Sequence, residues 1–421
     1  YGGGVCIYEN TTLLGTTNIT GNTVKNGSDS SDSNLYLASS SYTVALSDSN
    51  GNKLSAGSQI GVVTEYNPSS GTDKKFATDA SEDEMINYFT SDKGYTVCKQ
   101  GTDLYLTVAP SDLYQSDNKF YLDAEKTKLT NIKTMAEAVK IATNIHMLSV
   151  YTASSDETVE VPSGKNVTVS RYSTFTNDAM IRVNGGNLTV KATDTTSSIT
   201  FDGQNVETTV KYADGGIIHV AGTEGTSLAL TGADNNGTKT INFVNSFVKG
   251  PSAGGAIRNN GTATLTNCNI SNNKASPTDG GSIAGGVSNF GTLTMESCLV
   301  SGNSTTENMS GGIYAGSNAI KSTIKNCQVT NNSSKMYGGG IFLSSGGSDS
   351  SGSPVSVIEE CTGTGNTAGD STATPAVNGY GAGIYIGTGT KGTSTISRTM
   401  ISENNAAGGG GLYISGGTNT L

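Results

Sequence analysis

The chain has 421 residues, among them 56 Gly and no Trp, and a formal net charge of −10. Its 25 Lys and Arg residues are scattered singly, which excludes the basic stripe that nucleic acids or anionic membranes require. No run reaches the roughly 18 apolar residues of a membrane-spanning helix. The abundance of Thr, Ser, Asn and Gly is typical of exported surface proteins, so we expect an extracellular location at a cell surface.

Residues 1–34 contain the phrase Thr17-Asn-Ile19-Thr-Gly-Asn22, which returns near the end of the chain as Thr399-Met-Ile401-Ser-Glu-Asn404. An aliphatic residue stands three positions before each phrase. A short phrase that recurs with Gly and Asn between apolar residues predicts coils of a β-solenoid. We therefore interpret residues 1–34 as the terminal coil of a preceding solenoid.

Residues 35–118 break the phrase and predict a small β-rich module. Its strand candidates, each rich in β-branched and aromatic residues, are 35–38, 42–46, 60–66, 95–98 and 104–108, with a short helix near 84–89. No residue pattern in this module predicts a functional site.

A helix is expected over residues 132–144, at the start of the third segment, 119–421. Thr134 and Glu137 have capping-box spacing, and Ile132, Met135 and Val139 fall on one apolar face. The open end of a solenoid exposes both its core and its strand edges. We interpret this helix as the cap of that end.

The rest of the third segment carries eight apolar triplets, most of them after a small Gly-rich turn. They are Ile181–Val183, Ile218–Val220, Ile257–Asn259, Val287–Asn289, Ile313–Ala315, Ile341–Leu343, Ile384–Ile386 and Leu412–Ile414. Alternation with period 2 predicts strands whose outer members point inward and whose middle member points into solvent. The fold class is therefore all-β, and the architecture is a right-handed parallel β-helix.

A second strand of each coil ends in the phrase Cys or Thr-x-Ile or Val-x-x-Asn. We expect its final Asn to occupy a corner and bond the coils above and below. The phrase places four cysteines in a line, Cys268, Cys298, Cys327 and Cys361. Side chains that point alike are poorly placed for disulfides or for a tetrahedral metal site, so we favour free thiols that pack as small apolar groups and leave disulfides as the alternative.

The charged residues of the coils predict ladders rather than catalysis. Glu296, Lys325 and Glu359 occupy one position on successive coils, and Glu360 lies one coil below Arg398. Only eight acidic residues occur from 251 to 421, and none of them forms an Asp-x-Asp or Asp-Asp pair. The two histidines, His146 and His219, have no evident triad or metal partner. We therefore expect no enzyme, catalytic residue, cofactor or metal.

The middle residues of the last four triplets are all aromatic and form a candidate binding surface: Tyr314, Phe342, Tyr385 and Tyr413. Stacked aromatic rings could bind a sugar or a protein partner, or could simply stabilise the sheet. A second column, Thr264, Thr294, Thr323 and Thr395, raises ice binding as an alternative function.

The tetrapeptide Gly254-Gly-Ala256-Ile257, followed by Ile270-Ser-Asn-Asn273, resembles the repeats of chlamydial-type polymorphic outer-membrane proteins. The layout of residues 130–421 and of the first coil is also similar to large β-helix surface proteins of anaerobic bacteria. This resemblance implies an extracellular bacterial structural protein, a stalk, fibre or adhesin. Its expected partners are copies of itself or neighbouring tandem repeats, or glycans and host or matrix surfaces.

The two chain ends favour self-association in particular. Leu421 falls in the column of Leu265, just before the next expected Cys or Thr phrase. We expect either a piece of a longer tandem protein or a subunit that stacks head to tail. The alternative for the whole chain is a polysaccharide-active β-helix enzyme, a lyase or a glycoside hydrolase.

Overall fold

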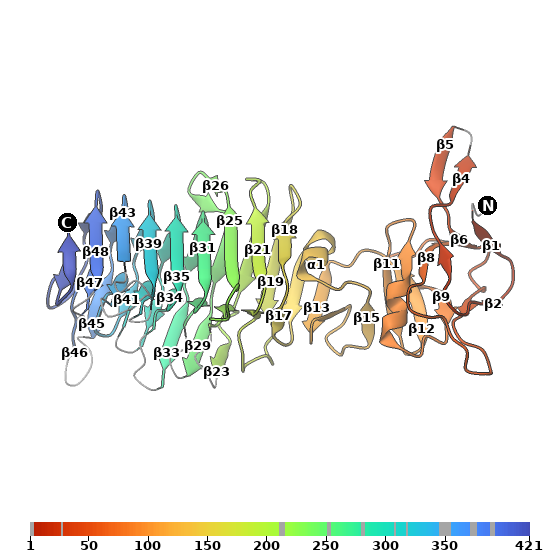
Figure 1. The fold of residues 1–421 in the computed structure, drawn as a ribbon, viewed down its shortest axis with the longest axis horizontal. Helices are drawn as coiled ribbons and strands as arrows, with labels where there is room; N and C mark the ends of the chain where they lie inside the picture. The colour runs from red at the N-terminus through yellow and green to blue at the C-terminus, as the bar shows by residue number, and fades with distance from the viewer. Residues whose placement is uncertain are drawn as a thin grey trace. The chain divides into compact units, whose positions relative to one another are not determined.

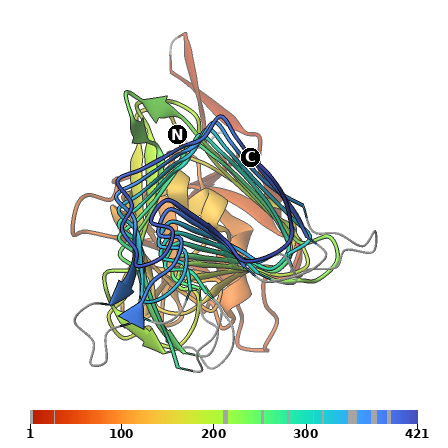
Figure 2. The same cartoon turned by 90° about the vertical axis from the view of Figure 1, so that its left-hand side faces the viewer.

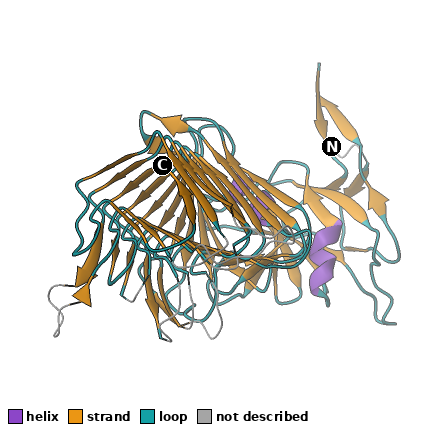
Figure 3. Ribbon diagram, turned by 60° about the vertical axis from the view of Figure 1, so that its left-hand side comes forward, coloured by secondary structure: helices purple, strands orange, loops and turns teal. Residues whose placement is uncertain are grey.

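The computed structural model describes residues 4–26, 28–209, 215–250, 254–278, 283–306, 309–316, 319–344, 355–370, 377–387 and 392–421. They form two compact units, Tyr1–Ala142 and Thr143–Leu421. In the described residues of both units almost all of the regular secondary structure is β-strand, as expected (Figures 1 and 3). The expected divisions after residues 34 and 118 stay a prediction.

Unit 1 begins with short parallel strands, among which stands the antiparallel pair β4 (Thr23–Asn26) and β5 (Asp29–Asp32), and continues with antiparallel strands. The parallel strands are β1 (Val5–Ile7), β2 (Thr11–Thr12), β3 (Asn18–Ile19), β6 (Leu35–Leu37), β7 (Val44–Ala45), β8 (Gln59–Thr64), β9 (Lys74–Thr78) and β10 (Phe89–Ser91). The antiparallel part contains β11 (Thr96–Gln100), β12 (Asp103–Thr107), β13 (Asp112–Ser116), β14 (Lys119–Tyr121) and β15 (Lys128–Thr130). Their core includes Phe76, Met85 and Phe89, all fully buried.

The five predicted strands of this module and its short helix are all present, with ends shifted by a few residues. The short helix is a 3-10 helix, η1 (Asp83–Tyr88). The predicted helix at 132–144 is present but shorter, as α1 (Met135–Ile141). The hydroxyl of Thr134 accepts from the backbone N–H of Glu137 at 3.2 Å, and the Glu137 carboxylate accepts from the N–H of Lys133 at 2.7 Å. The Thr134 bond is the one that capping-box spacing predicts, whereas the Glu137 carboxylate bonds the residue before the N-cap. The role of α1 as the cap of the solenoid stays a prediction.

In unit 2 the chain visits three parallel sheets in a fixed order, and a short fourth sheet joins them from the third coil onward. Sheet 1 is β17 (Tyr151–Ala153), β20 (Ile181–Val183), β24 (Ile218–Val220), β30 (Ile257–Asn259), β34 (Val287–Asn289), β38 (Ile313–Ala315), β42 (Ile341–Leu343), β47 (Ile384–Ile386) and β50 (Leu412–Ile414). Sheet 2 is β18 (Glu157–Glu160), β21 (Asn187–Ala192), β25 (Ser227–Gly232), β31 (Thr262–Thr266), β35 (Thr292–Glu296), β39 (Lys321–Lys325), β43 (Val355–Glu359), β48 (Thr393–Ser397) and β51 (Thr418–Thr420).

Sheet 3 follows sheet 2 on each coil. It contains β16 (Asn144–Met147), β19 (Asn166–Arg171), β22 (Ser198–Asp202), β28 (Ile241–Val244), β32 (Cys268–Ser271), β36 (Leu299–Ser301), β40 (Gln328–Thr330), β44 (Thr362–Thr364) and β49 (Met400–Ser402). The short sheet 4 contains β23 (Glu207–Thr209), β29 (Phe247–Gly250), β33 (Lys274–Pro277), β37 (Ser304–Thr305), β41 (Ser333–Ser334) and β45 (Thr367–Asp370). Seen end-on, the coils of unit 2 lie over one another (Figure 2). This arrangement of long parallel sheets is compatible with a β-helix.

All eight predicted triplets are strands of sheet 1, paired in the predicted register. Their outer members are buried up to β47 and become partly exposed in β50. The glycines that precede most of the triplets are needed because the backbones approach closely. At Gly338 φ is +57°, and a Cβ on Gly340 would meet the carbonyl oxygen of Gly383 at 2.7 Å.

The corner asparagines form the predicted ladder. The side-chain Oδ1 of Asn303 accepts both the backbone N–H and the Nδ2 of Asn273, each at 3.0 Å, and Asn303 donates in the same way to Asn332. The pattern continues through Asn366 to Asn404. The second hydrogen of Asn303 Nδ2 bonds the carbonyl of Ile270 on the coil below at 2.8 Å. Each rung therefore ties neighbouring coils together inside a dry core.

Candidate functional site

The aromatic column of sheet 1 is in register but is not exposed, which corrects the expectation that middle residues face solvent. Tyr314, Phe342 and Tyr385 are only 3%, 6% and 8% exposed, and only Tyr413, on β50, is partly open. Their rings stack on successive coils, with centroids 5.3 Å apart for Tyr314 and Phe342 and 4.9 Å for Phe342 and Tyr385. The column therefore packs as a layer of its own outside the sheet.

A second aromatic layer covers this column. Tyr337 and Tyr380 lie in the segments that lead into β42 and β47, and their ring centroids are 6.1 Å apart. Tyr337 lies 4.9 Å from the ring of Tyr385, and Tyr380 lies 5.2 Å from that of Tyr413. Burial among these tyrosines raises the pKa of Tyr337. Alternation along the strand could not reveal this layer, because it comes from the turns between strands.

Toward the N-terminus the same column changes from aromatic to polar side chains, beginning with Ser288. Arg182, His219 and Arg258 occupy it on successive coils. Arg182 bonds Asp178 at 2.8 Å, His219 bonds Asn260 at 3.0 Å, and the Arg258 guanidinium lies 4.2 Å above the Phe290 ring. These contacts hold the three side chains against turn residues. Turn residues hold the aromatic rings farther along the column in a similar way.

The cysteine column is buried and holds free thiols at all four positions, Cys268, Cys298, Cys327 and Cys361. The backbone N–H of Cys298 donates to the sulfur of Cys327 at 3.4 Å, and that of Cys327 donates to the sulfur of Cys361 at 3.4 Å. Burial raises the pKa of the Cys268 thiol. Buried free thiols in this position pack as small apolar side chains, in agreement with the favoured interpretation.

The predicted charge ladder is present in part, at the corner between sheets 2 and 3: Glu296 is the register neighbour of Lys325, but the ion pairs join only Lys325, Glu359, Glu360 and Arg398. Lys325 lies 3.5 Å from Glu359, and Arg398 bonds both Glu359 and Glu360, the latter at 3.0 Å. The Arg398 side chain is 61% exposed. Such pairs contribute at most about 1 kcal/mol and have no reactive group poised between them.

The threonine column lies on the outer face of sheet 2. Thr264, Thr294 and Thr323 are direct neighbours across β31, β35 and β39, but Val357 takes the next position before Thr395. A column that is interrupted in this way does not form a continuous hydroxyl array, and ice binding stays an untested alternative.

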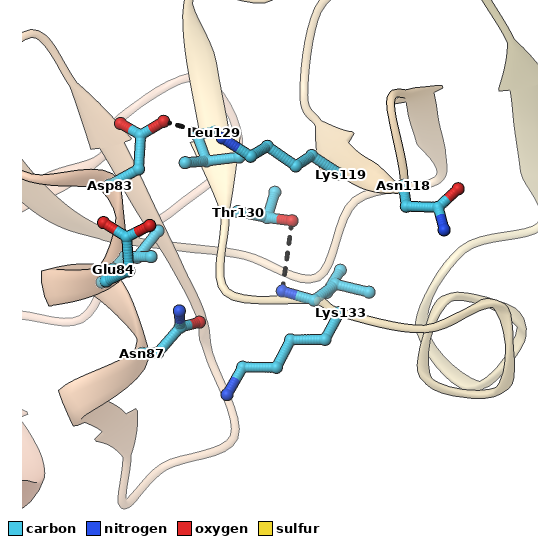
Figure 4. Close-up of a pocket in the computed structure, with 10 residues that line it drawn as sticks. Asp83, Glu84, Asn87, Asn118, Lys119, Leu129, Thr130 and Lys133 are labelled. Carbon is cyan, nitrogen blue, oxygen red and sulfur yellow. Dashed lines mark hydrogen bonds and ion pairs between the residues drawn. The ribbon is translucent and has the colours of Figure 1, made fainter. Parts of the chain in front are cut away.

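A small pocket in unit 1, of about 120 Å³, was missed by the sequence reasoning (Figure 4). Asp83 on η1 bonds Lys119 and Lys99, each at 3.0 Å, beside a floor that includes Leu129. The hydrogen bonds from Lys99 and then Lys119 lower the pKa of Asp83, and the bond to Asp83 raises the pKa of Lys119. The carboxylate is thus held ionised by two cations, which suits structural pairing better than proton transfer.

Among the described residues, no group of three or more His, Cys, Asp or Glu side chains is placed to hold a metal ion. His146 bonds the hydroxyl of Ser170 at 3.1 Å within sheet 3. Neither helix in the described part of the chain has the length and apolar character of a membrane-crossing helix. No known protein family, curated protein or solved structure matches this chain.

Proposed function

We propose that this chain is part of an extracellular bacterial surface protein in which unit 2 is a right-handed parallel β-helix that serves as a stalk or fibre element. Its function is mechanical and associative: it projects from the cell and stacks on further coils of its own kind. The observation that carries this proposal is the continuous registration of unit 2, in which sheets, asparagines and thiols repeat coil after coil.

Registration of this kind favours a rigid rod. Each rung of the asparagine ladder uses three side-chain hydrogen bonds to join neighbouring coils, and the rungs are fully buried from Asn273 to Asn366. The aromatic layer adds ring pairs worth about 0.5–1.5 kcal/mol each beyond their burial. Stability therefore accumulates along the axis through contacts between nearest neighbours.

The last described coil supports the associative part of the proposal. Its strands β49, β50 and β51 pair in the described chain only with β44, β47 and β48. Met400, Ile414 and Leu421 are 56%, 39% and 73% exposed there. A strand edge beside exposed apolar side chains is a template for another strand, such as one from a second copy of this chain.

Sedimentation of the purified chain over a range of concentrations, combined with electron microscopy, tests this function. We expect concentration-dependent assemblies that elongate along the coil axis. Ile414→Lys should weaken them because it places a charge on the exposed edge, whereas Val63→Thr in unit 1 is not expected to affect them. A strictly monomeric particle at high concentration would contradict self-stacking.

A polysaccharide-degradation screen on the same preparation tests the enzyme alternative. Cleavage of any polymer would replace the structural proposal. Binding without cleavage would instead support an adhesive role beside the structural one.

A further inference from the structure

A second pocket lies on unit 2, where a hairpin covers the corner between sheets 2 and 3. Residues 232–240 stand between Thr231 and Ile241, whereas their neighbours on the next coil, Thr266 and Cys268, flank a single residue, Asn267. The extra residues form the hairpin β26 (Asp234–Asn235) and β27 (Thr238–Lys239), visible as a projection from the coils (Figure 1).

The hairpin is held in place by bonds within its own turn and by bonds to the preceding coil, which carries β21. The Thr240 hydroxyl accepts the N–H of Ala233 at 2.7 Å and donates to the carbonyl of Ala192. Asn235 Nδ2 donates to the carbonyl of Thr195 at 3.3 Å. The tip is closed by Asp234, which accepts from the N–H of Gly237 at 2.7 Å. These bonds make the hairpin a fixed wall.

The opposite wall is a column of corner residues from three coils. Asn267, Ser297 and Asn326 have left-handed backbones, with φ of 53°, 55° and 50°. Together with Asp234, Gly237, Lys239, Cys298, Leu299 and Gln328 they enclose a cavity of about 230 Å³. That volume is below the roughly 300–1,000 Å³ of pockets for drug-sized ligands, so the cavity suits a ligand the size of one sugar ring.

Several lining groups keep unused hydrogen-bonding capacity. Asn267 Nδ2 donates to the carbonyl of Gly232 at 3.2 Å, and Asn326 Nδ2 donates to the hydroxyl of Ser297 at 2.9 Å. Within the described residues no bond is made by the Oδ1 atoms of Asn267 and Asn326, or by the side-chain amide of Gln328. The Ser297 hydroxyl, which accepts from Asn326, still has its proton to donate. Acceptors and donors therefore alternate along one wall.

The charges of the pocket cancel. The Lys239 ammonium lies 2.7 Å from the Asp234 carboxylate, and its side chain is only 9% exposed. The bond from Lys239, followed by that from Gly237, lowers the pKa of Asp234. A paired cation offers little to an anion, and a single carboxylate offers little to a metal ion. The side chain of Leu299, which is partly exposed, adds an apolar surface.

We propose that this pocket binds a neutral saccharide, one ring at a time, through the amides of Asn267, Asn326 and Gln328 and the hydroxyl of Ser297. Carboxamides can both accept from and donate to hydroxyl groups on adjacent ring carbons, and Leu299 can contact the C–H face of the ring. This site goes beyond the structural role proposed above and does not depend on self-stacking.

Saturation-transfer NMR on the full chain tests the site, with the methyl glycosides of glucose, galactose, mannose and N-acetylglucosamine as probes. Inorganic phosphate and glycine are the comparison ligands. We expect saturable binding of at least one glycoside and of neither comparison ligand. Gln328→Ala and Asn326→Gly should each lower the affinity about tenfold, the loss expected when a good hydrogen bond to a ligand is removed.

Two matched variants control for changes in the fold. Thr362→Ala changes the neighbour of Gln328 on the next coil, and Glu360→Gly changes a corner whose φ of 55° resembles that of Asn326, both outside the pocket. Both should bind the glycoside as the unchanged chain does. The proposal is overturned if no glycoside binds, if binding survives both pocket variants, or if phosphate or glycine binds instead. Because binding is read from the ligand, a failure of self-stacking would leave the result interpretable.

Discussion

The two units build the same asparagine hydrogen bonds from different sequences. In unit 2 the rungs are 30, 29, 34 and 38 residues apart, and each is an asparagine. In unit 1, Asn22 donates its N–H and Nδ2 to Asn34, 12 residues away, and Asn34 donates in the same way to Asp92, 58 residues away. Coil stacking therefore does not need even spacing, only a side-chain oxygen at the right corner.

The rung of unit 1 that ends at Asp92 differs from the rungs of unit 2 in chemistry as well as in spacing. Both oxygens of Asp92 accept, at 2.8 and 2.9 Å, and a carboxylate has no hydrogen to pass to a further coil. Asparagine accepts and donates, so unit 2 can extend its ladder from coil to coil. The comparison suggests that an Asp at this corner ends a ladder, whereas an Asn continues it.

Asn303→Ala should have the largest effect on stability. It leaves two buried donors on Asn273 and the carbonyl of Ile270 without the Asn303 side chain as a partner, at about 1–3 kcal/mol each, so we expect unit 2 to lose about 3–9 kcal/mol in urea unfolding. Asn235→Ala, on the exposed hairpin, is the control and should cost less than about 0.5 kcal/mol. Equal losses of unfolding free energy for the two variants would show that the asparagine ladder does not stabilise unit 2.

The ladder and the triplets were predictable because each recurs on several successive coils. The alternation of Ile313 and Ala315 predicted the strand β38. The Asn at the end of each phrase predicted the position of the corner between coils. The ladder of unit 1 was not predictable, because Asn34 and Asp92 belong to no repeated phrase. The two pockets were missed for a related reason, since their walls come from η1 and from an inserted hairpin that occurs once.

Phe342→Ala tests the second feature that distinguishes unit 2, its outer aromatic layers. Phe342 is 6% exposed and stacks between Tyr314 and Tyr385, so its truncation leaves a cavity that we expect to cost about 3–5 kcal/mol. Phe342→Leu keeps most of the volume and should cost less. Thermal unfolding followed by near-ultraviolet circular dichroism measures both costs. An unchanged unfolding midpoint for Phe342→Ala would contradict a packing role for the column and would favour a binding surface instead.

Substitution of Asp92 tests directly whether the two ladders are equivalent. In unit 2 a single Oδ1 takes both donors, so Asp92→Asn can preserve both bonds and should cost only about 1 kcal/mol, the loss of charge assistance. Asp92→Ala removes both acceptors and should cost about 2–4 kcal/mol. Hydrogen exchange at the amides of unit 1 measures the two values. Equal costs would mean that the charge, and not the corner geometry, stabilises this rung.

The smallest predicted effect is on the stability of unit 1 at acidic pH. Because Lys99 and Lys119 lower the pKa of Asp83 below its usual 3.8, this carboxylate stabilises the folded unit above the unfolded pKa, and the contribution is lost as pH falls through the folded pKa. The Asp83 and Lys119 side chains are nearly half exposed, so solvent screens the pair and the contribution stays below about 1 kcal/mol. Asp83→Asn should therefore flatten the loss of unit 1 protection below about pH 4, as measured by hydrogen exchange. Glu84→Gln, its neighbour in the same pocket, should leave that loss unchanged; the reverse result would assign the acid response of unit 1 to another carboxylate.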